Sequence, residues 1–204
     1  MKEEHLSYNQ IIKEDLQMNT IRLPFYYLNI LNEDLSLKEE EDAFAYLDWF
    51  MEEAAKNELY IVLDLHGAPG SQNGFEHSGR KDRVAGLWTN EAYVNATVEM
   101  WKLISKHYTE TKPELGKWIA TYDILNEPTY EYNTITTKEC WEVMDQIYDV
   151  IRANGDKHVI TMEGCWDFAK LPNPEDYGWE NVQYEYHWYN WWSNILPTEL
   201  VYAY

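Results

Sequence analysis

The chain contains 204 residues, and its 36 acidic side chains outnumber 16 basic ones, giving a formal net charge of −20 and a pI of about 4.5. This charge argues against nucleic acid and anionic membrane surfaces as partners, because both are bound through clustered Lys and Arg. A hydrophobic fraction of 45% supports a packed core. No apolar run reaches the roughly 20 residues of a membrane span, and no secretory signal follows Met1. We therefore expect a soluble chain.

Five apolar segments rich in β-branched and aromatic residues are predicted strands: 20–26, 59–65, 119–125, 158–162 and 181–186. Apolar residues at helical spacing separate them over 36–56, 90–107 and 137–153. This strict alternation predicts right-handed βαβ crossovers and a parallel sheet. Neither an internal repeat nor a break in composition marks a domain boundary, so residues 1–204 are expected to belong to one domain.

The first long helix shows two signals at its start. Ser36 and Glu39 have the spacing of a capping box. The acidic run 39–42 is interpreted as a first turn favoured by the helix dipole, in preference to a cation site. Tryptophans on the predicted helices are assigned to packing: Trp49, Trp101 and Trp141. The two cysteines, Cys140 and Cys165, have no zinc spacing and form no disulfide framework, so unpaired thiols are expected, with no metal and no cofactor.

Polar and titratable residues gather near the carboxyl ends of the predicted strands. In a parallel barrel these ends form the rim on which active sites are built. A single histidine there is more often structural than catalytic, but coincident placements on five strands indicate a site. The residues are Arg22, His66, Asn126, Glu127, Glu163, His187 and Tyr189.

The tripeptide Asn126-Glu127-Pro128 after a strand, together with the ordered Arg, His and His-x-Tyr placements, resembles glycoside hydrolase family 5. The resemblance covers about residues 8–192. It implies retaining β-glycosidase chemistry on an α/β fold, the (β/α)8 TIM barrel, of which this chain would hold strands 2 to 6. The segment 64–74 looks like a loop of the exo-β-1,3-glucanase-like branch.

The resemblance also implies roles for individual residues. Glu127 would be the general acid/base, with a pKa raised by its surroundings. Asn126 would donate a hydrogen bond to the sugar 2-hydroxyl, and Arg22 would hold the nucleophilic carboxylate. The expected lining of the subsite at which the glycosidic bond breaks is His66, His187 and Tyr189.

Tryptophans in predicted loops near this rim could stack on the apolar face of a pyranose or could simply pack in the core. They are Trp88, Trp166, Trp188, Trp191 and Trp192. Trp166 and Trp188 are included among the expected substrate-binding residues.

A retaining glycosidase also needs a nucleophilic carboxylate, which the resemblance places on strand 7. Arg22 and His187 are separated by about 165 residues in four intervals, so eight units of about 41 residues would need roughly 330. We therefore expect a fragment of a longer hydrolase, with open sheet edges through which it could self-associate. Glu163 is a weaker candidate for the nucleophile, and Glu185 is expected to form a structural ion pair, for instance with Arg22.

The expected function is cleavage of β-1,4- or β-1,3-linked glucans or their oligosaccharides, by a protein that is extracellular or at the cell surface. One alternative is a barrel remnant that binds carbohydrate without turnover. Another is an unrelated barrel enzyme, a metal-dependent hydrolase or lyase with His and Glu ligands. The missing nucleophile predicts that the chain by itself is inactive or impaired.

Overall fold

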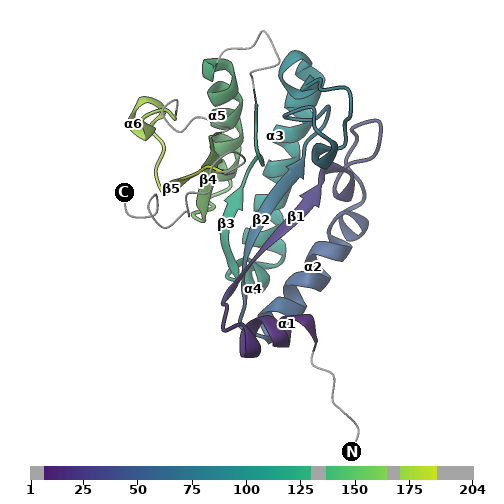
Figure 1. Ribbon diagram of the computed structural model, residues 1–204, viewed down its shortest axis with the longest axis vertical. Helices are drawn as coiled ribbons and strands as arrows, with labels where there is room; N and C mark the ends of the chain where they lie inside the picture. Colours follow the sequence, from purple (N-terminus) through teal and green to yellow (C-terminus); the bar gives the residue numbers. More distant parts are fainter. Residues whose placement is uncertain (1–6, 130–136, 165–170, 188–204) are drawn as a thin grey trace, which may run out of the picture.

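The computed structural model describes residues 7–129, 137–164 and 171–187. Its centre is a parallel sheet in which each strand pairs with the next one along the chain (Figure 1). The strands are β1 (Thr20–Tyr26), β2 (Tyr60–Gly67), β3 (Ile119–Asp123), β4 (Val159–Glu163) and β5 (Val182–Glu185). All five predicted strands are confirmed, with ends within two residues of those expected. This sequential parallel order is the order of strands in a (β/α)8 barrel.

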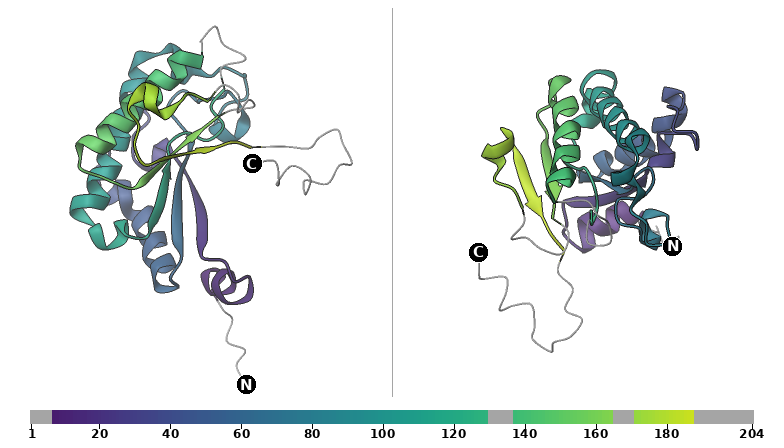
Figure 2. Two further views of the ribbon diagram at one scale, coloured as in Figure 1. Left: turned by 90° about the vertical axis from the view of Figure 1, so that its left-hand side faces the viewer. Right: turned by 90° about the horizontal axis from the view of Figure 1, so that it is seen from above.

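The three long helices lie on one side of the curved sheet, and Figure 2 shows them along its outer, convex face. They are α2 (Glu40–Lys56), α3 (Glu91–Lys106) and α5 (Thr137–Ala153). Shorter helical segments are α1 (Tyr8–Gln10), η1 (Ile11–Asp15), η2 (Tyr27–Asn29), η3 (Glu76–Ser78), η4 (Gly86–Thr89), η5 (His107–Thr111), α4 (Pro113–Gly116) and α6 (Pro174–Tyr177). The fold is thus a partial barrel wall with its helices outside.

Helix α2 begins later than predicted, and the predicted capping box is wrong. Glu39 is the N-cap but contributes no side-chain hydrogen bond to the helix. The Ser36 hydroxyl instead bonds to the side chains of Asn32 and Asp34 in the preceding turn. The Ser36 hydroxyl thus has its hydrogen-bond partners within this turn, so the helix starts after it. The acidic first turn is confirmed by the side chains at 40–42.

The apolar core lies between the sheet and these helices. Trp101 is fully buried there and donates its indole N–H to the Ile124 carbonyl at 3.1 Å. Trp141 is also buried, but Trp49 is 59% exposed, so its assignment to packing is wrong. Cys140 is a buried, free thiol, while Cys165 lies outside the described residues.

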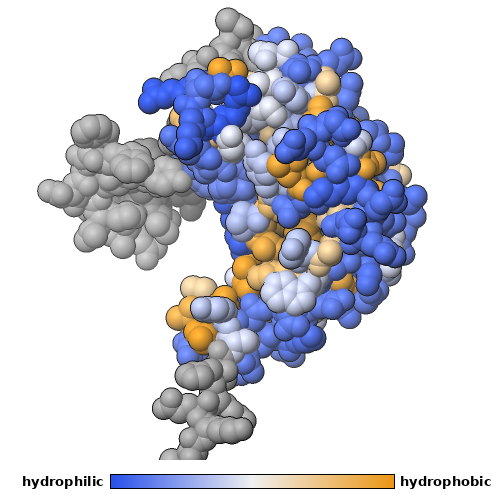
Figure 3. Space-filling model, turned by 90° about the vertical axis from the view of Figure 1, so that its right-hand side faces the viewer, coloured by the Kyte–Doolittle hydropathy of each residue, from blue (hydrophilic) through white to orange (hydrophobic). Residues whose placement is uncertain are grey.

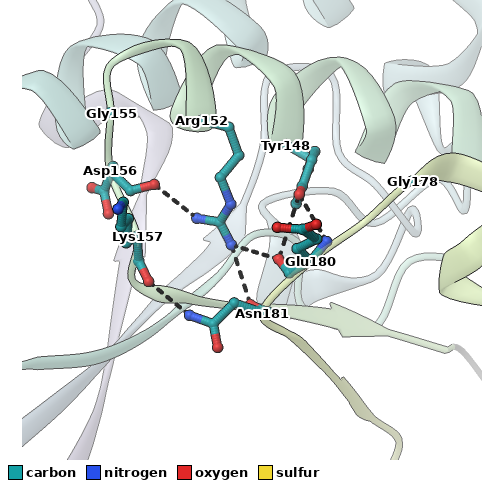
Figure 4. Close-up of a pocket in the computed structure, with 8 residues that line it drawn as sticks. All are labelled: Tyr148, Arg152, Gly155, Asp156, Lys157, Gly178, Glu180 and Asn181. Atoms are coloured by element: carbon teal, nitrogen blue, oxygen red, sulfur yellow. Dashed lines mark hydrogen bonds between the residues drawn. The ribbon is translucent and has the colours of Figure 1, made fainter.

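At the amino ends of β4 and β5, Arg152 of α5 ties two loops to the helix beside a cavity of about 520 Å³ (Figure 4). Its guanidinium lies 4.9 Å from the centroid of the Tyr148 ring. It donates to four backbone carbonyls, those of Asp156, His158, Glu180 and Asn181. Because these carbonyls occupy the guanidinium, we interpret the cavity as a structural feature of the far end of the sheet.

The outer strands of the sheet are less buried than the inner ones. Only one residue of β1, Phe25, is buried, whereas four of the five residues of β3 are. On the face drawn in Figure 3, apolar side chains gather in the middle and lower parts within a hydrophilic surround. Large exposed apolar residues of the described chain include Tyr8, Leu16, Met18, Tyr46 and Trp49. No helix within the described ranges is both long and apolar enough to cross a membrane.

Candidate active site

Arg22 of β1 is at the centre of a largely buried ion cluster with carboxyl groups of β2, β3, β4 and β5. Arg22 donates through Nε to Asp123 Oδ2 at 3.1 Å, and its Nη1 lies 3.2 Å from Asp64 Oδ2. Glu163 and Glu185 are further away, at 3.7 and 4.0 Å from Nη2. Alternation along β2 explains the placement, because Asp64 points away from the apolar Leu63 and Leu65 that pack under the helices.

Four carboxyl groups around one guanidinium leave an excess of negative charge in a buried region. Burial raises the pKa of Asp123, and the neighbouring Asp64 charge raises it further. Burial likewise raises the pKa of Glu163 to about 9. Within the described chain, Oδ1 of Asp64 and Oδ1 of Asp123 are buried without a hydrogen-bond partner. Part of this cluster is therefore protonated at neutral pH.

The tripeptide after β3 turns sharply at Glu127, whose φ of 45° lies in the left-handed region. Two neighbours hold the backbone there. The Glu127 N–H donates to Glu163 Oε2 at 2.8 Å, and Asn73 Nδ2 donates to the Glu127 carbonyl at 3.1 Å. The strained turn thereby directs the Glu127 side chain while its backbone polar groups are satisfied.

The loop after β2 forms a buried polar support for this turn. Gln72 donates through Nε2 to the carbonyls of His66 and Asn126, at 3.0 and 2.8 Å. The backbone carbonyl of Gln72 accepts hydrogen bonds from the Thr129 N–H and from the indole N–H of Trp88. The four fully or almost fully buried polar residues of the loop are Ser71, Gln72, Asn73 and Ser78. Hydrogen bonds, more than apolar contacts, thus fix the loop to the tripeptide.

The Glu127 carboxyl lies between two imidazoles. His187 Nδ1 is 2.7 Å from Glu127 Oε1, and His77 Nε2 is 3.3 Å from Oε2. The hydrogen bond to Glu127, and a second one from Nε2 to Glu185 at 3.0 Å, raise the pKa of His187 to about 10. Burial lowers the pKa of His77, although Glu127 acts against it. Near neutral pH the two rings therefore differ in charge.

The structure brings together several of the residues selected from the sequence: Arg22, Asn126, Glu127 and His187. Arg22 Nη2 donates to Asn126 Oδ1 at 3.0 Å, which leaves the buried Asn126 Nδ2 without a hydrogen-bond partner among the described residues. The predicted ion pair between Arg22 and Glu185 is confirmed at 4.0 Å, although His187 is the nearer partner of Glu185.

His66 lies at the edge of this cluster, inside β2 and not after it as predicted. Its Nδ1 is 2.8 Å from Asp64 Oδ2, and its ring centroid is 5.5 Å from that of His77. Trp88, expected at the rim, supports the loop through Gln72. Three predicted substrate-binding residues lie outside the described residues: Trp166, Trp188 and Tyr189.

Sequence reasoning missed His77, which follows the recognised segment 64–74 by three residues. No apolar period or strand end marks it, because a loop of buried polar side chains carries it to Glu127. The buried carboxylate of Asp123 was also missed as a partner of Arg22. An acidic side chain in the middle of an apolar strand was the available signal.

The residues could also hold a metal ion at one place. Glu127, Glu163 and His187 each offer a ligand atom, and these atoms lie within 4.8 Å of one another. Carboxylate and imidazole ligands suit zinc and similar divalent ions. The same three groups are, however, already joined by the hydrogen bonds described above.

Helices outside a sequential parallel sheet, with titratable side chains at the carboxyl ends of its strands, define part of a (β/α)8 barrel with a rim site. The particular family follows from the sequence. The chain belongs to the cellulase family, glycosyl hydrolase family 5, whose model matches residues 5–199.

Relatives with similar sequences agree with this assignment. The chain is 32% identical to a beta-xylosidase of Phanerodontia chrysosporium, over 87% of this chain and 36% of that protein. It is 33% identical to the probable glucan 1,3-beta-glucosidase A of Neosartorya fischeri, over 88% of this chain and 41% of that protein. The chain thus spans well under half the length of these relatives.

Among solved structures, the rutinosidase of Aspergillus niger has a TM-score of 0.72 at 14% identity, covering 92% of this chain and 55% of that one. The cellulose synthase subunit Z of Clostridioides difficile has a TM-score of 0.64 at 20% identity, covering 92% and 56%. At these identities the likeness concerns the fold.

Proposed function

We propose that this chain carries the acid/base half of a retaining β-glycosidase site that acts on β-linked glucans or their oligosaccharides. The observation that carries the proposal is the Glu127 carboxyl, 7% exposed and fixed between His187 and His77. It follows a parallel strand at the rim, beside Asn126, whose buried Nδ2 has no hydrogen-bond partner among the described residues. Family membership supports the reaction class.

The two steps of the reaction make different demands on Glu127. In the first, Glu127 donates its proton to the glycosidic oxygen as the leaving group departs. In the second, the carboxylate takes a proton from the water that attacks the glycosyl-enzyme. Asn126 Nδ2 would donate to the sugar 2-hydroxyl, a contact that strengthens in the transition state.

The nucleophile is proposed to lie outside the described residues. Glu163 is unsuitable because it is fully buried, holds the Glu127 backbone through Oε2, and has a pKa raised by burial to about 9. A protonated carboxyl cannot attack an anomeric carbon. Glu185 is engaged by His187 and Arg22. Arg22 reaches the rim and would orient the incoming nucleophilic carboxylate.

The substrate class is proposed from the relatives and from the side chains near the site. Relatives named for glucan 1,3-beta-glucosidase activity favour a β-glucan substrate for this chain. The proposed substrate-binding residues are Arg22, His66, Asn126, His187, Tyr189, Trp188 and Trp166. We also propose that the full-length protein works outside the cell or at its surface, where polymeric glucans are met.

Two other functions have specific tests. If the protein binds cello- or laminari-oligosaccharides in calorimetry without releasing reducing sugar, it is a carbohydrate-binding remnant. The cluster of Glu127, Glu163 and His187 favours the metal-dependent alternative. Activity that is lost with a chelator and restored by Zn²⁺ would support that alternative, whereas our proposal expects activity that chelation leaves unchanged.

The test of the main proposal is Glu127→Gln in the full-length protein, assayed on an unactivated glucan. We expect a loss of at least 10²-fold in kcat/KM, the usual contribution of a general acid. Glu99→Gln is the matched control, since Glu99 is exposed on α3 and pairs with Lys102. Full activity of Glu127→Gln would exclude the assigned role.

A further inference from the structure

The hydrogen bonds of the Asn73 side chain fix the tautomer of His77. Asn73 Oδ1 accepts from the backbone N–H of Phe75 at 2.9 Å and from the Ser78 hydroxyl at 2.6 Å. Asn73 Nδ2 donates to the Glu127 carbonyl at 3.1 Å and lies 2.9 Å from His77 Nε2. Because an amide nitrogen only donates, the lone pair of His77 Nε2 accepts this second hydrogen bond. The Asn73 amide then has a partner at every donor and acceptor.

This arrangement leaves a single ring proton on His77, at Nδ1. A proton on Nε2 would place two donors against each other, so the ring is neutral. Glu127 Oε2 lies 3.3 Å from the same Nε2, but the lone pair of this nitrogen is already used by Asn73. The Nδ1–H points away from Nε2, and among the described residues it has no hydrogen-bond partner. It is therefore available to a ligand.

The neighbouring ring of His66 leaves its other nitrogen available. His66 Nδ1 lies 2.8 Å from Asp64 Oδ2, and the same oxygen lies 3.2 Å from the Arg22 guanidinium. Because this oxygen faces a guanidinium donor, it carries no proton, so His66 Nδ1 donates to it. In the neutral ring Nε2 then carries the lone pair. Within the described part of the chain, this Nε2 has no partner.

The two imidazoles lie next to each other, with 5.5 Å between their ring centroids and 61° between their planes. The side chain of His66 is 32% exposed and that of His77 is 37% exposed, so a ligand can reach both. One ring offers a hydrogen-bond acceptor and the other a donor. A hydroxyl group both donates and accepts, and a pyranose carries hydroxyls on neighbouring carbons. The pair therefore suits a neutral sugar better than a charged ligand.

We propose that His77 is a substrate-binding residue that donates its Nδ1–H to a hydroxyl of the pyranose bound beside Glu127, next to the acceptor offered by His66. The inference rests on the proposed function and deepens it, because it names the substrate group that His77 recognises. Asn73 is the positioning residue, since its amide holds the His77 ring in the donor tautomer. His77 itself takes no part in proton transfer. Removing either the imidazole or the matching sugar hydroxyl should weaken the same contact.

The experiment combines substitution of His77 with deletion of single hydroxyls from the substrate. The full-length wild type and His77→Leu are assayed on 2,4-dinitrophenyl β-glucoside and on its monodeoxy analogues. Because this leaving group needs no acid assistance, the rates report contacts with the sugar and not the proton transfer from Glu127. We expect His77→Leu to lower kcat/KM about fivefold to tenfold on the parent glucoside, and to have little effect on the analogue that lacks the recognised hydroxyl.

The matched control is His158→Leu, because His158 bonds Asp156 and the Gly116 carbonyl at the far end of the sheet. Any loss of kcat/KM in this control should be the same factor for every substrate. If His77→Leu likewise lowers kcat/KM by one common factor on the parent glucoside and on all the analogues, the inference is overturned.

A second measurement leaves His77 in place. The ring ¹⁵N shifts of His77 in the wild-type protein distinguish the two neutral tautomers, and we expect the Nδ1–H form; the Nε2–H form would overturn the inference. If Glu127→Gln loses activity on the glucan while no analogue distinguishes His77→Leu from the wild type, the proposed function stands and only the role of His77 falls. If Glu127→Gln is fully active on the glucan, the proposed function itself falls.

Discussion

The Glu163 carboxyl accepts a hydrogen bond from the backbone N–H of Glu127, with 2.8 Å between Oε2 and the nitrogen. This contact links the end of β4 to the strained turn that carries Glu127. A carboxyl that is buried and supports a neighbouring backbone behaves differently from one that reacts with substrate. The protonation of Glu163 should therefore change the free energy of unfolding of the protein.

Glu163→Gln should change how stability depends on pH. The folded pKa of Glu163, about 9, lies above its usual value of about 4.3, so the folded state binds more protons than the unfolded state between these values. The free energy of unfolding of the wild type should therefore fall as the pH rises from 4.3 to 9. The variant lacks this contribution and should be the more stable protein at pH 9. Urea titrations at pH 5, 7 and 9 give the free energy of unfolding of both proteins. The same dependence on pH in the two would contradict the raised pKa of Glu163.

Arg22→Met should be strongly destabilising at neutral pH. It removes the cation between Asp64 and Asp123, both fully buried, and leaves their charge uncompensated. Breaking a buried ion pair in this way costs about 3–5 kcal/mol. The cost should be smaller at pH 5, where more of the cluster is protonated. Denaturant unfolding measures this cost, with Lys102→Met, at an exposed residue of α3, as the control. A change of less than about 1 kcal/mol at pH 7 for Arg22→Met would contradict this description of the cluster.

Arg152→Met should loosen the amino ends of β4 and β5. Four carbonyls lose a charged donor, and Tyr148 loses a cation over its ring. Solvent can satisfy part of this loss, so a destabilisation on the order of 2 kcal/mol is expected. Lys138→Met, which removes an exposed cation from α5, is the control. Equal unfolding midpoints for the two variants would show that Arg152 has no such role.

The 204-residue chain should self-associate when it is produced by itself. Its edge strand β1 has a single buried residue, and large apolar side chains such as Leu16 and Met18 are exposed. Unpaired edges with apolar surface promote association. Sedimentation velocity over a hundredfold concentration range should show growing mass. A monomer throughout that range would remove this proposal.

The alternation of apolar runs and helical spacing was sufficient to predict the strands, because burial on one or both faces imposes those periods directly. Helix α2 was predicted to start too early, since the Ser36 hydroxyl found partners in its own turn. Exposure of Trp49 could not be foreseen from its helical position alone. Whether a surface is covered depends on which elements lie beside it.

Within the site, Asn126, Glu127 and His187 could be predicted because each follows the end of a strand, and Arg22 because it is a charged residue inside an otherwise apolar strand. His77 could not, because it reaches Glu127 through a loop whose path depends on buried hydrogen bonds of Gln72 and Asn73. Such polar networks have no period in sequence. They become visible only when the distances are known.

The most direct test of the central claim is chemical rescue of Glu127→Ala in the full-length protein. With 2,4-dinitrophenyl β-glucoside the first step needs no acid, so the glycosyl-enzyme should accumulate, because its hydrolysis lacks a base. Azide needs no general base and should restore turnover and yield the β-glucosyl azide, identified by its anomeric NMR signal. An α-glucosyl azide, or a variant that turns over glucan normally without azide, would contradict Glu127 as the acid/base of a retaining enzyme.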